Sequence, residues 1–434
     1  MRAPVVVVGG GHNGLICAAY LARAGIDTVL VEARDTVGGC ASTVSDLGAR
    51  FNICNCDHTM IRAMPVIDEL ELGEHGLRYL EAEAGFVNVF HDDSPPWASF
   101  HEIDRQLDSL AASYPSQVEG YRRYLEDAMP VAELVIAMAR TKPSTSGMIG
   151  TALRRRASGA ARLLDWSRRS ADDVFSRYFD DWHVTMPVVS TGPTVWGVHP
   201  SWPGTGLAAA AFATRHLIKT GRPVGGSGAL TDAIAASFAA AGGVVRAGSR
   251  VTRLLVAGGR VDGVELADGT RIEAAAVVAA CDPHRVFVDW VGEAPAAARR
   301  LVRRWHDRPV HDGYESKIDA VLDQLPRYRF AEAIEAACPG VDVLEPHDRG
   351  LALAGGPGGG PRRPRGGPRR RPAHDAGERA VGPRRCHGPR RRGTRAQPRG
   401  AVHPLRARRR LAVVDRARPM ARSLARDDRV HLPR

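Results

Sequence analysis

The stretch VVVVGGGHNGLICAAYLARAGIDTVLVEARDTVGG, residues 5–39, decides the fold of this chain. Its four consecutive valines predict a fully buried parallel strand. Gly9, Gly11 and Gly14 then complete a G-x-G-x-x-G turn that opens an apolar, alanine-rich helix over residues 15–24. Strand, glycine turn and helix in this order begin a Rossmann unit, so the sequence predicts an α/β protein that binds a nucleotide cofactor.

Each glycine of this turn has its own physical task. Gly9 permits the tight turn out of the strand, Gly11 lets the backbone approach a pyrophosphate, and Gly14 lets the helix pack against the sheet. The helix N-terminus offers free N–H groups and a partial positive charge to the phosphates. Gly25 ends the helix, DTVLVE forms a second strand, and Glu32 lies at its tip, where its carboxylate is expected to bond both ribose hydroxyls. A carboxylate there repels a 2′-phosphate, so NADP is disfavoured.

Length and composition indicate a globular cytoplasmic protein. With 434 residues the chain is long enough for two or three domains with a substantial core. The first strand begins too early to leave room for a secretory signal, and no stretch approaches the ~18 apolar residues that span a bilayer. The seven cysteines, an odd number, do not form a disulfide framework. Cys54 and Cys56 lack a second pair of ligands at zinc-like spacing, so we expect reduced thiols and no metal.

The net charge of +12 comes from the C-terminal tail alone. Residues 351–434 hold 24 Arg, no Lys and 5 acidic residues, whereas residues 1–350 hold 36 basic and 43 acidic residues. From about residue 355 the chain contains no Phe, Trp, Tyr or Ile and shows no sustained periodicity. Such a segment buries too little apolar surface to offset the entropy lost on ordering, so we expect residues 351–434 to be disordered.

Two explanations of this tail stay open. An arginine-rich arm binds phosphate backbones, although RNA-binding tails usually also carry aromatic side chains for stacking, which this tail lacks. The abrupt change to Arg, Gly, Pro and Ala is also what a GC-rich gene gives when it is read out of frame, and a chain with only three lysines fits such a gene. We favour the frameshift. Resequencing across the codons for residues 335–360 decides the question, because an intact frame there excludes it.

The middle of the chain is helical by its apolar spacing. The segments IDRQLDSLAASY, VEGYRRYLEDAMPVAELVIAMA and SADDVFSRYFDDW, within residues 101–181, repeat apolar residues at steps of three and four. The basic stretch LRRRASGAARLLDWSRR, residues 153–169, suits a solvated helix face, which we favour, or contact with an anionic membrane surface.

A later segment returns to the first sheet. An apolar helix over residues 230–241 ends at Gly242, and the short strand VVRAG follows. The segment VTRLLVAGGRVDGVELADGTRIEA then alternates through strands joined by an Ala-Gly-Gly turn and an Asp268-Gly269 hairpin. The stretch AAVVAACDP closes with another buried strand.

Three blocks of this sequence resemble the FAD-dependent oxidoreductases of the amine oxidase and phytoene desaturase type, including proteins described as NAD(P)/FAD-dependent oxidoreductases. The first block is residues 5–14. The second is EARDTVGGCAST, which places the di-glycine turn Gly38-Gly39 shortly after Glu32. The third runs from PVGGSGALTDAI to AAVVAACDP. A plain NAD-dependent dehydrogenase would lack the second glycine turn and the antiparallel strands.

The resemblance implies FAD as the cofactor and assigns roles in holding it. Glu32 would bind the ribose, the backbone near Ala33 and Arg34 would line the adenine side, and the backbone amide and carbonyl of Val251 would meet the adenine edge. The chain over residues 39–42 would pass the pyrophosphate and isoalloxazine. The implied cofactor-binding residues are Gly9, Gly10, Gly11, Gly14, Glu32, Ala33, Arg34, Gly38, Gly39, Ala41, Ser42 and Val251.

The resemblance also implies the domain organisation, a Rossmann-type FAD-binding domain with an antiparallel β-meander and a discontinuous α+β substrate domain. The boundaries that we expect are 1–75 for the first FAD-binding portion, 76–220 for a largely helical substrate domain, 221–290 for the return to the FAD-binding domain, 291–350 for part of the substrate domain and 351–434 for the tail.

The chain departs from this family at two points. Many relatives carry Arg after the second di-glycine pair, where this chain has Cys40 and so supplies no charge to the flavin or pyrophosphate. The family also ends with a Gly-rich turn and a helix whose N-terminus points at the flavin pyrimidine ring. No segment after Asp348 resembles this element, and we expect a chain without it to bind FAD weakly or not at all.

The implied reaction removes a hydride from carbon or nitrogen of an organic substrate to flavin N5. The largely helical substrate domain, residues 76–220, suits an apolar substrate, such as an isoprenoid drawn from a membrane. Amines or other small molecules stay open as alternative substrates. No nucleophilic triad or paired carboxylates stand out. His58 and Arg62 could face the substrate, although a structural role is the commoner one. Trp196, His199 and Trp202 line an apolar channel or pack within a loop.

A function of a different class stays open beside this one. The chain would then be a truncated, inactive flavoprotein fold whose basic tail binds nucleic acid non-specifically. We expect no specific nucleic-acid partner.

Overall fold

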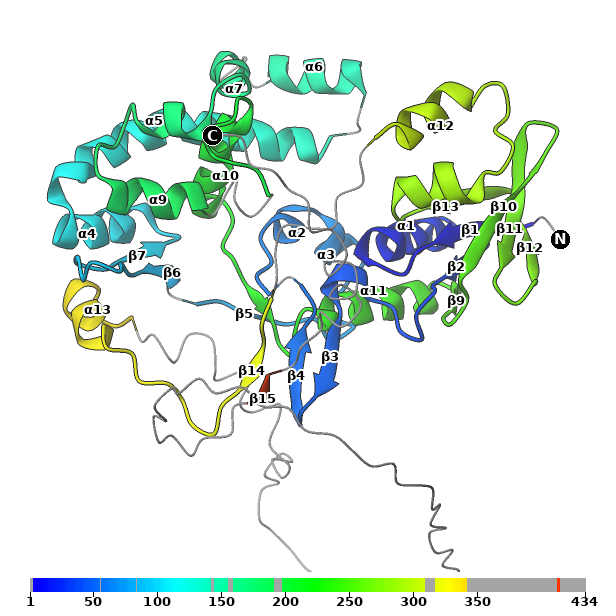
Figure 1. The fold of residues 1–434 in the computed structure, drawn as a ribbon, viewed down its shortest axis with the longest axis horizontal. Coiled ribbons are helices and arrows are strands. Elements are labelled where there is room, and N and C mark those ends of the chain that lie inside the picture. The colour runs from blue at the N-terminus through cyan, green and yellow to red at the C-terminus, as the bar shows by residue number, and fades with distance from the viewer. Residues whose placement is uncertain are drawn as a thin grey trace, which may run out of the picture.

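The structure is a computed structural model that describes residues 3–54, 56–82, 84–141, 144–154, 159–190, 197–308, 317–341 and 412–413. Figure 1 shows an α/β lobe at the right, which holds the N-terminus and the glycine-rich turn, and a helical lobe at the left. The hairpin of β3 (Thr43–Asp46) and β4 (Ala49–Asn52) lies between them, with the short helices α2 (Met60–Ala63) and α3 (Val66–Glu69). The prediction of a mixed α/β fold with a parallel sheet is confirmed.

A parallel sheet forms the centre of the α/β lobe. Its strand order is β13-β1-β2-β9, with β1 at Val5–Val8, β2 at Thr28–Val31, β9 at Val244–Arg246 and β13 at Ala276–Ala279. The predicted strand that returns to the first sheet is β13, which pairs in parallel with β1. The sheet therefore joins two strands from residues 5–31 with two strands from residues 244–279.

The four valines of β1 alternate between two cores, because successive side chains of a strand point to opposite faces. Val7 packs with Leu15 and Phe238 beneath α1 (His12–Arg23) and α11 (Gly228–Ala240). Val6 and Val8 pack on the other face, among residues of the antiparallel strands. The sheet is covered on both sides, which is why this strand is a continuous apolar run.

The predicted antiparallel segment is a three-stranded sheet of β10 (Val251–Ala257), β11 (Arg260–Leu266) and β12 (Arg271–Glu273). Its turns occur where the glycines predict them. Gly258 and Gly259 have φ angles of 57° and 79°, and Gly269 has a φ of 83°, which are left-handed conformations that favour glycine.

Helix boundaries differ from the sequence prediction by a few residues. The first helix starts at His12 rather than at residue 15, because the Gly11 carbonyl accepts the N–H of Leu15 and so opens the helix inside the glycine turn. It ends where predicted, before Gly25, whose φ is 75°. Helix α11 likewise begins inside its glycine-rich turn, at Gly228. Apolar spacing misses a first turn made of glycine and polar residues.

The chain leaves the α/β lobe at β5 (Tyr79–Leu80) and comes back at β8 (Arg222–Pro223), and these two strands pair antiparallel. Between them lies the hairpin of β6 (Ala84–Asn88) and β7 (Trp97–Phe100). The helices of this lobe are α4 (Ile103–Ser113), α5 (Val118–Ala139), α6 (Thr145–Arg154), α7 (Ala160–Trp166), α8 (Ala171–Phe175), α9 (Trp182–Ser190) and α10 (Ala208–Ala213). The helical character predicted within residues 101–181 is confirmed by α4 and α5, whereas the predicted segment SADDVFSRYFDDW is helical only over Ala171–Phe175, before α9 begins at Trp182.

Aromatic side chains fill the core of the helical lobe. Tyr121, Tyr124, Trp166 and Phe175 are fully buried and pack together with Trp97 of the hairpin. Tyr124 donates its hydroxyl hydrogen to the carbonyl of Ala209 at 2.5 Å, which satisfies a polar atom that would otherwise be buried alone. The lobe thus has a core of its own.

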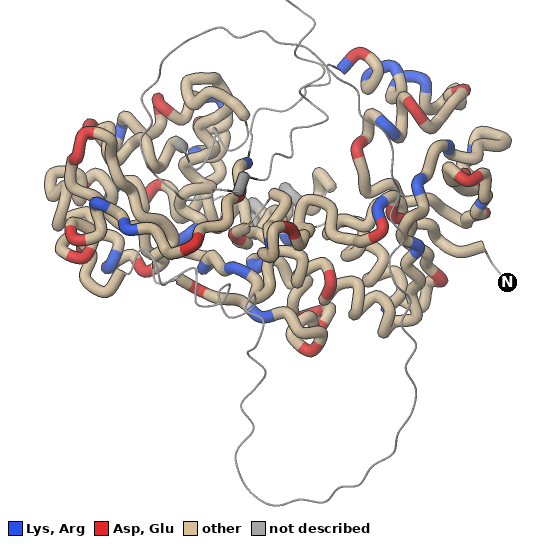
Figure 2. Tube along the Cα trace, turned by 60° about the horizontal axis from the view of Figure 1, so that its bottom comes forward, with Lys and Arg blue, Asp and Glu red and all other residues tan. Residues whose placement is uncertain are grey.

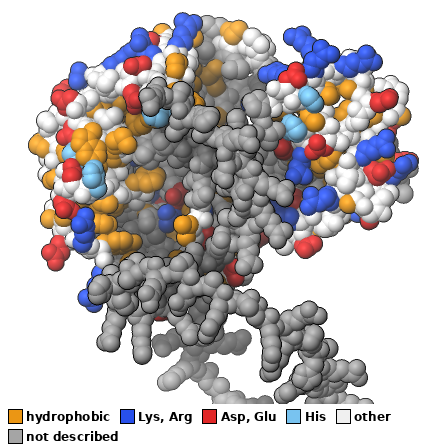
Figure 3. Space-filling model, in the orientation of Figure 1, with side chains coloured by type: hydrophobic (Ala, Val, Ile, Leu, Met, Phe, Trp, Pro, Cys, Tyr) orange, Lys and Arg blue, Asp and Glu red, His pale blue; other side chains and the backbone are white. Residues whose placement is uncertain are grey.

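Charged residues are interspersed over the described part of the chain (Figure 2), as the balance of residues 1–350 predicts. Basic side chains gather on α12 (Arg299–His306), at the upper right of Figure 3, where none of the helix residues is buried. In the basic stretch of the helical lobe, Arg162 and Arg169 form ion pairs with Asp127 and Asp165. A charged helix surface of this kind is normally solvated.

The remaining described elements follow the α/β lobe in sequence. They are the turn of π-helix over Arg285–Trp290, the helix α13 (Ala331–Ala337) beside α4, and the pair β14 (Ala320–Val321) and β15 (Ala412–Val413). Apart from residues 412–413, the predicted disordered tail and the segment after Asp348 lie outside the described residues.

Candidate functional site

The first glycine turn is shaped by backbone contacts that leave no room for side chains at two of its glycines. Gly9 has a φ of 110°, and a Cβ there would lie 2.7 Å from the Ala280 carbonyl oxygen at the end of β13. A Cβ on Gly14 would lie 1.9 Å from the carbonyl oxygen of Gly9. The absence of a side chain at Gly14 therefore lets the start of α1 contact the backbone of the glycine turn. The sequence predicted only that Gly14 lets the helix pack against the sheet.

Gly11 behaves differently, and it offers a test of whether the turn fits a dinucleotide. Its backbone is extended, with φ −74° and ψ 171°, and a Cβ there would meet only the Cα of Gly39, at 3.6 Å. That is an ordinary contact, so protein packing does not require glycine at this position. A pyrophosphate lying against the backbone does require it. The turn therefore fits the phosphates of a dinucleotide.

Glu32 lies at the end of β2, beside this turn, and its side chain is 11% exposed. One carboxylate oxygen accepts the N–H of Gly10 at 2.6 Å, and the other accepts the N–H of Arg34 at 2.8 Å. An ionised carboxylate has about four acceptor sites, so these bonds leave capacity for the two hydroxyls of a ribose. The sequence placed Glu32 at the site, but it did not indicate that its carboxylate also fixes the glycine turn.

The second glycine turn lies directly against the first. Gly38 donates its N–H to the carbonyl of Gly10 at 2.8 Å, and a Cβ on Gly39 would lie 2.8 Å from the Cα of Gly11. Gly38 and Gly39 have φ angles of 133° and 58°. Any side chain at Gly39 would push the two turns apart, so glycine is needed here for backbone-to-backbone contact.

Arg34 and Ser42 close this second turn. The hydroxyl of Ser42 donates to the carbonyl of Gly39 at 2.9 Å, and a terminal nitrogen of Arg34 donates to the same carbonyl at 3.1 Å. Ala41 is buried in the short 3₁₀ turn between them, while Ala33 is exposed. Sequence reasoning assigned only the backbone of Arg34 to the site and missed the contact of its side chain, which spacing cannot reveal.

The third block of the sequence reaches the same place through the backbone. Ser249 donates its N–H to the carbonyl of Glu32 at 2.7 Å, and Gly248 donates to the carbonyl of Arg34 at 2.8 Å. Val251, two residues further on, starts β10 and is buried. The structure therefore brings all the predicted cofactor-binding residues together around the paired glycine turns.

A further glycine-rich turn, residues 225–228, is held by the β3–β4 hairpin. Asn52 accepts the N–H of Ser227 at 2.8 Å, and the hydroxyl of Thr43 accepts the N–H of Gly228 at 2.8 Å. These side chains satisfy the first amide groups of α11. The hairpin thus links the second glycine turn to the segment that precedes α11.

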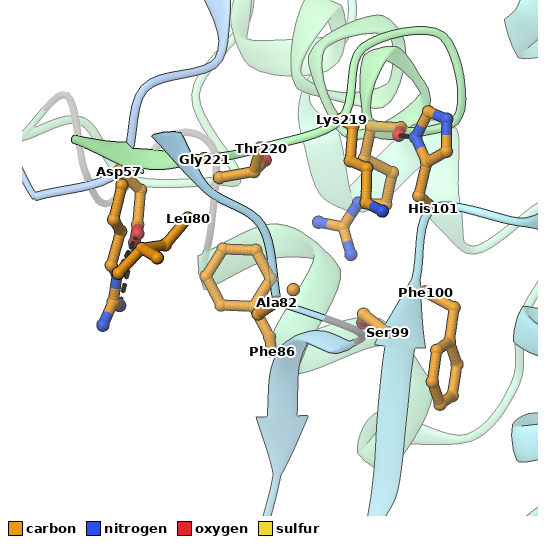
Figure 4. A pocket seen from close by; sticks show the side chains of 13 residues that line it. Asp57, Leu80, Ala82, Phe86, Ser99, Phe100, His101, Lys219, Thr220 and Gly221 are labelled. Atoms are coloured by element: carbon orange, nitrogen blue, oxygen red, sulfur yellow. Dashed lines mark hydrogen bonds and ion pairs between the residues drawn. The ribbon is translucent and has the colours of Figure 1, made fainter. Parts of the chain in front are cut away.

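A pocket opens beyond this hairpin, between the β6–β7 hairpin and the segment at residues 215–222 (Figure 4). Asp57 and Leu80 lie at one end of it, Lys219 and His101 lie at the other, and Phe86 lies between them. The volume open to a water-sized molecule is about 40 Å³. A space of this size holds a small polar group.

His58 and Arg62 support this pocket from behind instead of lining it. His58 exchanges backbone hydrogen bonds with Gly221, and its Nδ1 lies 3.0 Å from the hydroxyl of Tyr79. Arg62 donates to the carbonyl of Lys219 at 2.5 Å, and its guanidinium pairs with Glu81. Their hydrogen bonds indicate the structural role that was expected to be the commoner one.

The pH dependence of stability should report the burial of His58. Burial lowers the pKa of His58 to about 4 from an ordinary value of 6.5. Between these values the unfolded chain binds the proton that the folded chain refuses, so stability falls as the pH drops from 6.5 towards 4, by at most about 1.4 kcal/mol per pH unit for this group. His216, whose pKa burial also lowers to about 4, adds an effect of the same sign.

Urea unfolding at pH 6.5 and pH 5 should therefore show a smaller loss of stability in His58→Asn than in the parent. Asparagine can place a polar atom near the position of Nδ1 but does not titrate. An unchanged pH dependence in this variant contradicts the assignment, and His199→Asn, at an exposed position, serves as the control.

The predicted channel of Trp196, His199 and Trp202 is not part of this pocket. Trp196 lies outside the described residues. His199 is exposed and bonds to Ser201 at 2.6 Å, and Trp202 is 57% exposed on the helical lobe. The backbone N–H of Trp202 donates to the carbonyl of His199 at 3.0 Å, which closes a tight surface turn. Loop packing is therefore the correct interpretation for these two residues.

Metal-ligand clusters and membrane-crossing helices are both absent from the ranges that the structure describes. No group of three or more His, Cys, Asp or Glu residues there is arranged to hold a metal ion. No helix in the same ranges has the length and apolar character needed to cross a membrane.

Comparison with known proteins gives consistent matches. The family model described as flavin containing amine oxidoreductase matches residues 14–310. One subunit of the limonene dehydrogenase of Castellaniella defragrans is 26% identical over 299 residues, which cover 67% of this chain and 54% of that protein. Phytoene desaturase (lycopene-forming) of Pantoea ananas is 27% identical over 301 residues, which cover 68% and 59%. The chain therefore spans less than two thirds of the length of these relatives.

Among solved structures, wild-type putrescine oxidase bound to putrescine aligns over 70% of this chain and 63% of its own, with 18% identity and a TM-score of 0.48.

Proposed function

This chain belongs to the flavin-containing amine oxidoreductase family, and we propose that it is an FAD-dependent oxidoreductase that removes a hydride from an apolar organic substrate. FAD, when bound, supplies the acceptor for the hydride, at N5 of its ring system. The residues of the chain bind and orient the cofactor and shape the place where the substrate lies. The observation that carries the proposal is the contact of two glycine turns beside the carboxylate of Glu32.

Each part of this arrangement has a task in the proposal. The open backbone at Gly11 receives the pyrophosphate, and the N-terminus of α1 adds its partial positive charge. Glu32 accepts hydrogen bonds from the ribose hydroxyls and repels a 2′-phosphate. Val251 offers its backbone amide and carbonyl to the adenine edge. Arg34 and Ser42 hold the second glycine turn in contact with the first.

The substrate class is supported by the relatives and by the pocket. Two relatives are named for hydrocarbons, limonene and phytoene. In this chain Leu80 and Phe86 offer apolar surface at the pocket, and Phe86 is 39% exposed. The domain boundaries predicted from the sequence are part of the same proposal, with the substrate held between the FAD-binding portion and the helical insert.

Retention of FAD tests the proposal directly. The purified chain, incubated with FAD and passed through gel filtration, is expected to carry absorbance bands near ~450 nm. The matched control is Gly39→Val, in which the side chain separates the two glycine turns and the protein fraction is expected to be colourless. A colourless parent protein whose affinity for DNA collapses with added salt favours the alternative, an inactive fold with a nucleic-acid-binding tail.

A further inference from the structure

The pocket of Figure 4 carries more basic than acidic side chains. Arg215, Lys219 and Arg222 line it, whereas Asp57 is the one carboxylate among its lining residues. Charged side chains inside a small pocket are costly unless they are paired or meet a charged ligand. The pairing of each cation therefore shows which of them is available to a ligand.

Two of the three cations are already paired. Arg222 forms a two-point contact with Asp57, with Nε 2.5 Å from Oδ1 and Nη2 3.3 Å from Oδ2. Lys219 places its Nζ 3.4 Å from Glu81, which also pairs with Arg62 behind the pocket. The partners are Asp57, which lines the pocket, and Glu81, which lies outside the lining.

Arg215 has no carboxylate of a described residue within 4.0 Å, the limit for an ion pair. Its Nε donates to the carbonyl of Phe212 at 3.1 Å, and its guanidinium carbon lies 3.5 Å from the centre of the Phe212 ring and 5.3 Å from that of Phe86. Both distances lie within the range of a cation–π contact. The two terminal nitrogens of Arg215 have no hydrogen-bond acceptor among the described residues. Neither nitrogen is fully buried.

The backbone around Arg215 is fixed on both sides. The ring of His101 donates from Nδ1 to the carbonyl of Arg215 at 2.5 Å. The ring of His216 bonds to the carbonyl of His101 at 2.8 Å and to the hydroxyl of Tyr121 at 2.9 Å. A cation held this rigidly loses little further entropy when it binds a ligand.

We propose that Arg215 binds the carboxylate of an acidic substrate whose apolar part lies along Leu80 and Phe86. The two terminal nitrogens of a guanidinium match the two oxygens of a carboxylate, which makes a bidentate contact the best use of this side chain. The small volume of the pocket suits that head group, and the exposed ring of Phe86 suits the hydrocarbon.

The same charges exclude other head groups. A protonated amine would be repelled by Arg215, the unpaired cation of the pocket, so an amine substrate does not fit although the family is described by amine oxidation. Burial lowers the pKa of Arg215 to about 10, which still leaves the side chain charged at pH 7. One unpaired cation balances one negative charge, which favours a carboxylate over a phosphate monoester. The inference rests on the proposed function in that it assigns the pocket to the substrate.

Binding of matched eight-carbon probes tests this assignment. Octanoate, octanol, octylamine and octyl phosphate are titrated by calorimetry into the purified full chain, with and without FAD. We expect octanoate to bind at least ~10-fold more tightly than octanol, because one charge-assisted contact accounts for that ratio. Octylamine should bind no better than octanol. In Arg215→Gln the preference for octanoate should vanish, while Arg215→Lys, which keeps the charge without the fork, should retain part of it.

Arg222→Gln is the contrasting variant, because Arg222 is already paired, and it should keep at least half of the preference. Thermal melting of each variant shows whether Arg215→Gln has folded, and Arg215→Lys keeps the test decisive if it has not. Three results would overturn the proposal: equal affinity for octanoate and octanol in the parent, an unaltered preference in a folded Arg215→Gln, or tighter binding of octyl phosphate than of octanoate.

FAD retention is measured on the same samples. If the chain retains FAD but shows no preference for octanoate, this inference alone is refuted. If it prefers octanoate but does not retain FAD, the proposed function alone is refuted.

Discussion

Replacing Gly11 by alanine is expected to lower the affinity for FAD at least ~10-fold while the stability of the FAD-free protein stays unchanged. The fold accepts this methyl group, because the backbone at Gly11 is extended and the nearest atom to a Cβ is 3.6 Å away. A pyrophosphate at hydrogen-bond distance from the same backbone does not accept it. Loss of one charge-assisted contact of about 1.5–3 kcal/mol corresponds to a change in affinity of about 10-fold to 150-fold.

The matched control is Gly14→Ala, three residues further on in the same turn. A Cβ at Gly14 would lie 1.9 Å from the carbonyl oxygen of Gly9, so the turn itself must shift. Overpacking against backbone costs about 1–3 kcal/mol or more, and we expect Gly14→Ala to lose both stability and FAD binding. Urea unfolding without FAD and flavin fluorescence titration separate the two effects. A Gly11→Ala protein that binds FAD like the parent, or that is destabilised as much as Gly14→Ala, contradicts the assignment of the turn.

Replacing Glu32 by glutamine should affect both cofactor binding and stability. The glutamine oxygen still accepts one of the two N–H groups that Glu32 accepts, from Gly10 or from Arg34, but its NH₂ group faces the other donor. An unsatisfied donor in this buried place costs about 1–3 kcal/mol. The ribose loses its anionic acceptor as well, so we expect FAD to bind at least ~10-fold more weakly.

A pair of nucleotide probes separates these two consequences. The parent protein should bind ADP and discriminate against the same nucleotide with a 2′-phosphate, and Glu32→Gln should lose most of this discrimination because the repelling charge is gone. Glu71→Gln, which changes a half-exposed carboxylate paired with Arg23 away from the turn, is the control and should bind both probes like the parent. Equal discrimination in Glu32→Gln and the parent contradicts the role of Glu32.

The α/β lobe could be read from the sequence because its signals are local. Valine runs, the alternation of the antiparallel strands and the glycines that end α1 and α11 each act within a few residues of the chain. These features predicted β1, the meander and the return of β13 to the first sheet, all of which are confirmed. The start of α1 was placed too late, because Gly11 opens that helix through its carbonyl and no apolar residue marks the position.

The sequence predicted only part of the cofactor site. Spacing indicated which residues belong to it, but the hydrogen bond from Gly10 to Glu32 and the contact of the Arg34 side chain with the second turn join segments whose distance the sequence does not give. The prediction for Trp196, His199 and Trp202 shows the limit of residue type as a guide. Aromatic residues suggest a channel, but the exposure of Trp202 depends on where the fold places its loop.

The order and chemistry of neighbouring residues were enough to establish the layered α/β architecture, the nucleotide turn and the resemblance to the family, because strand burial and glycine conformations are local properties. The tertiary structure instead decides which charged side chains are left without a partner. Asp57 pairs with Arg222 and Glu81 with Lys219, across large separations in the chain, and Arg215 is left over. The net charge of a segment gives no indication of this result, because charge compensation depends on which distant side chains the fold brings within a few ångströms of each other.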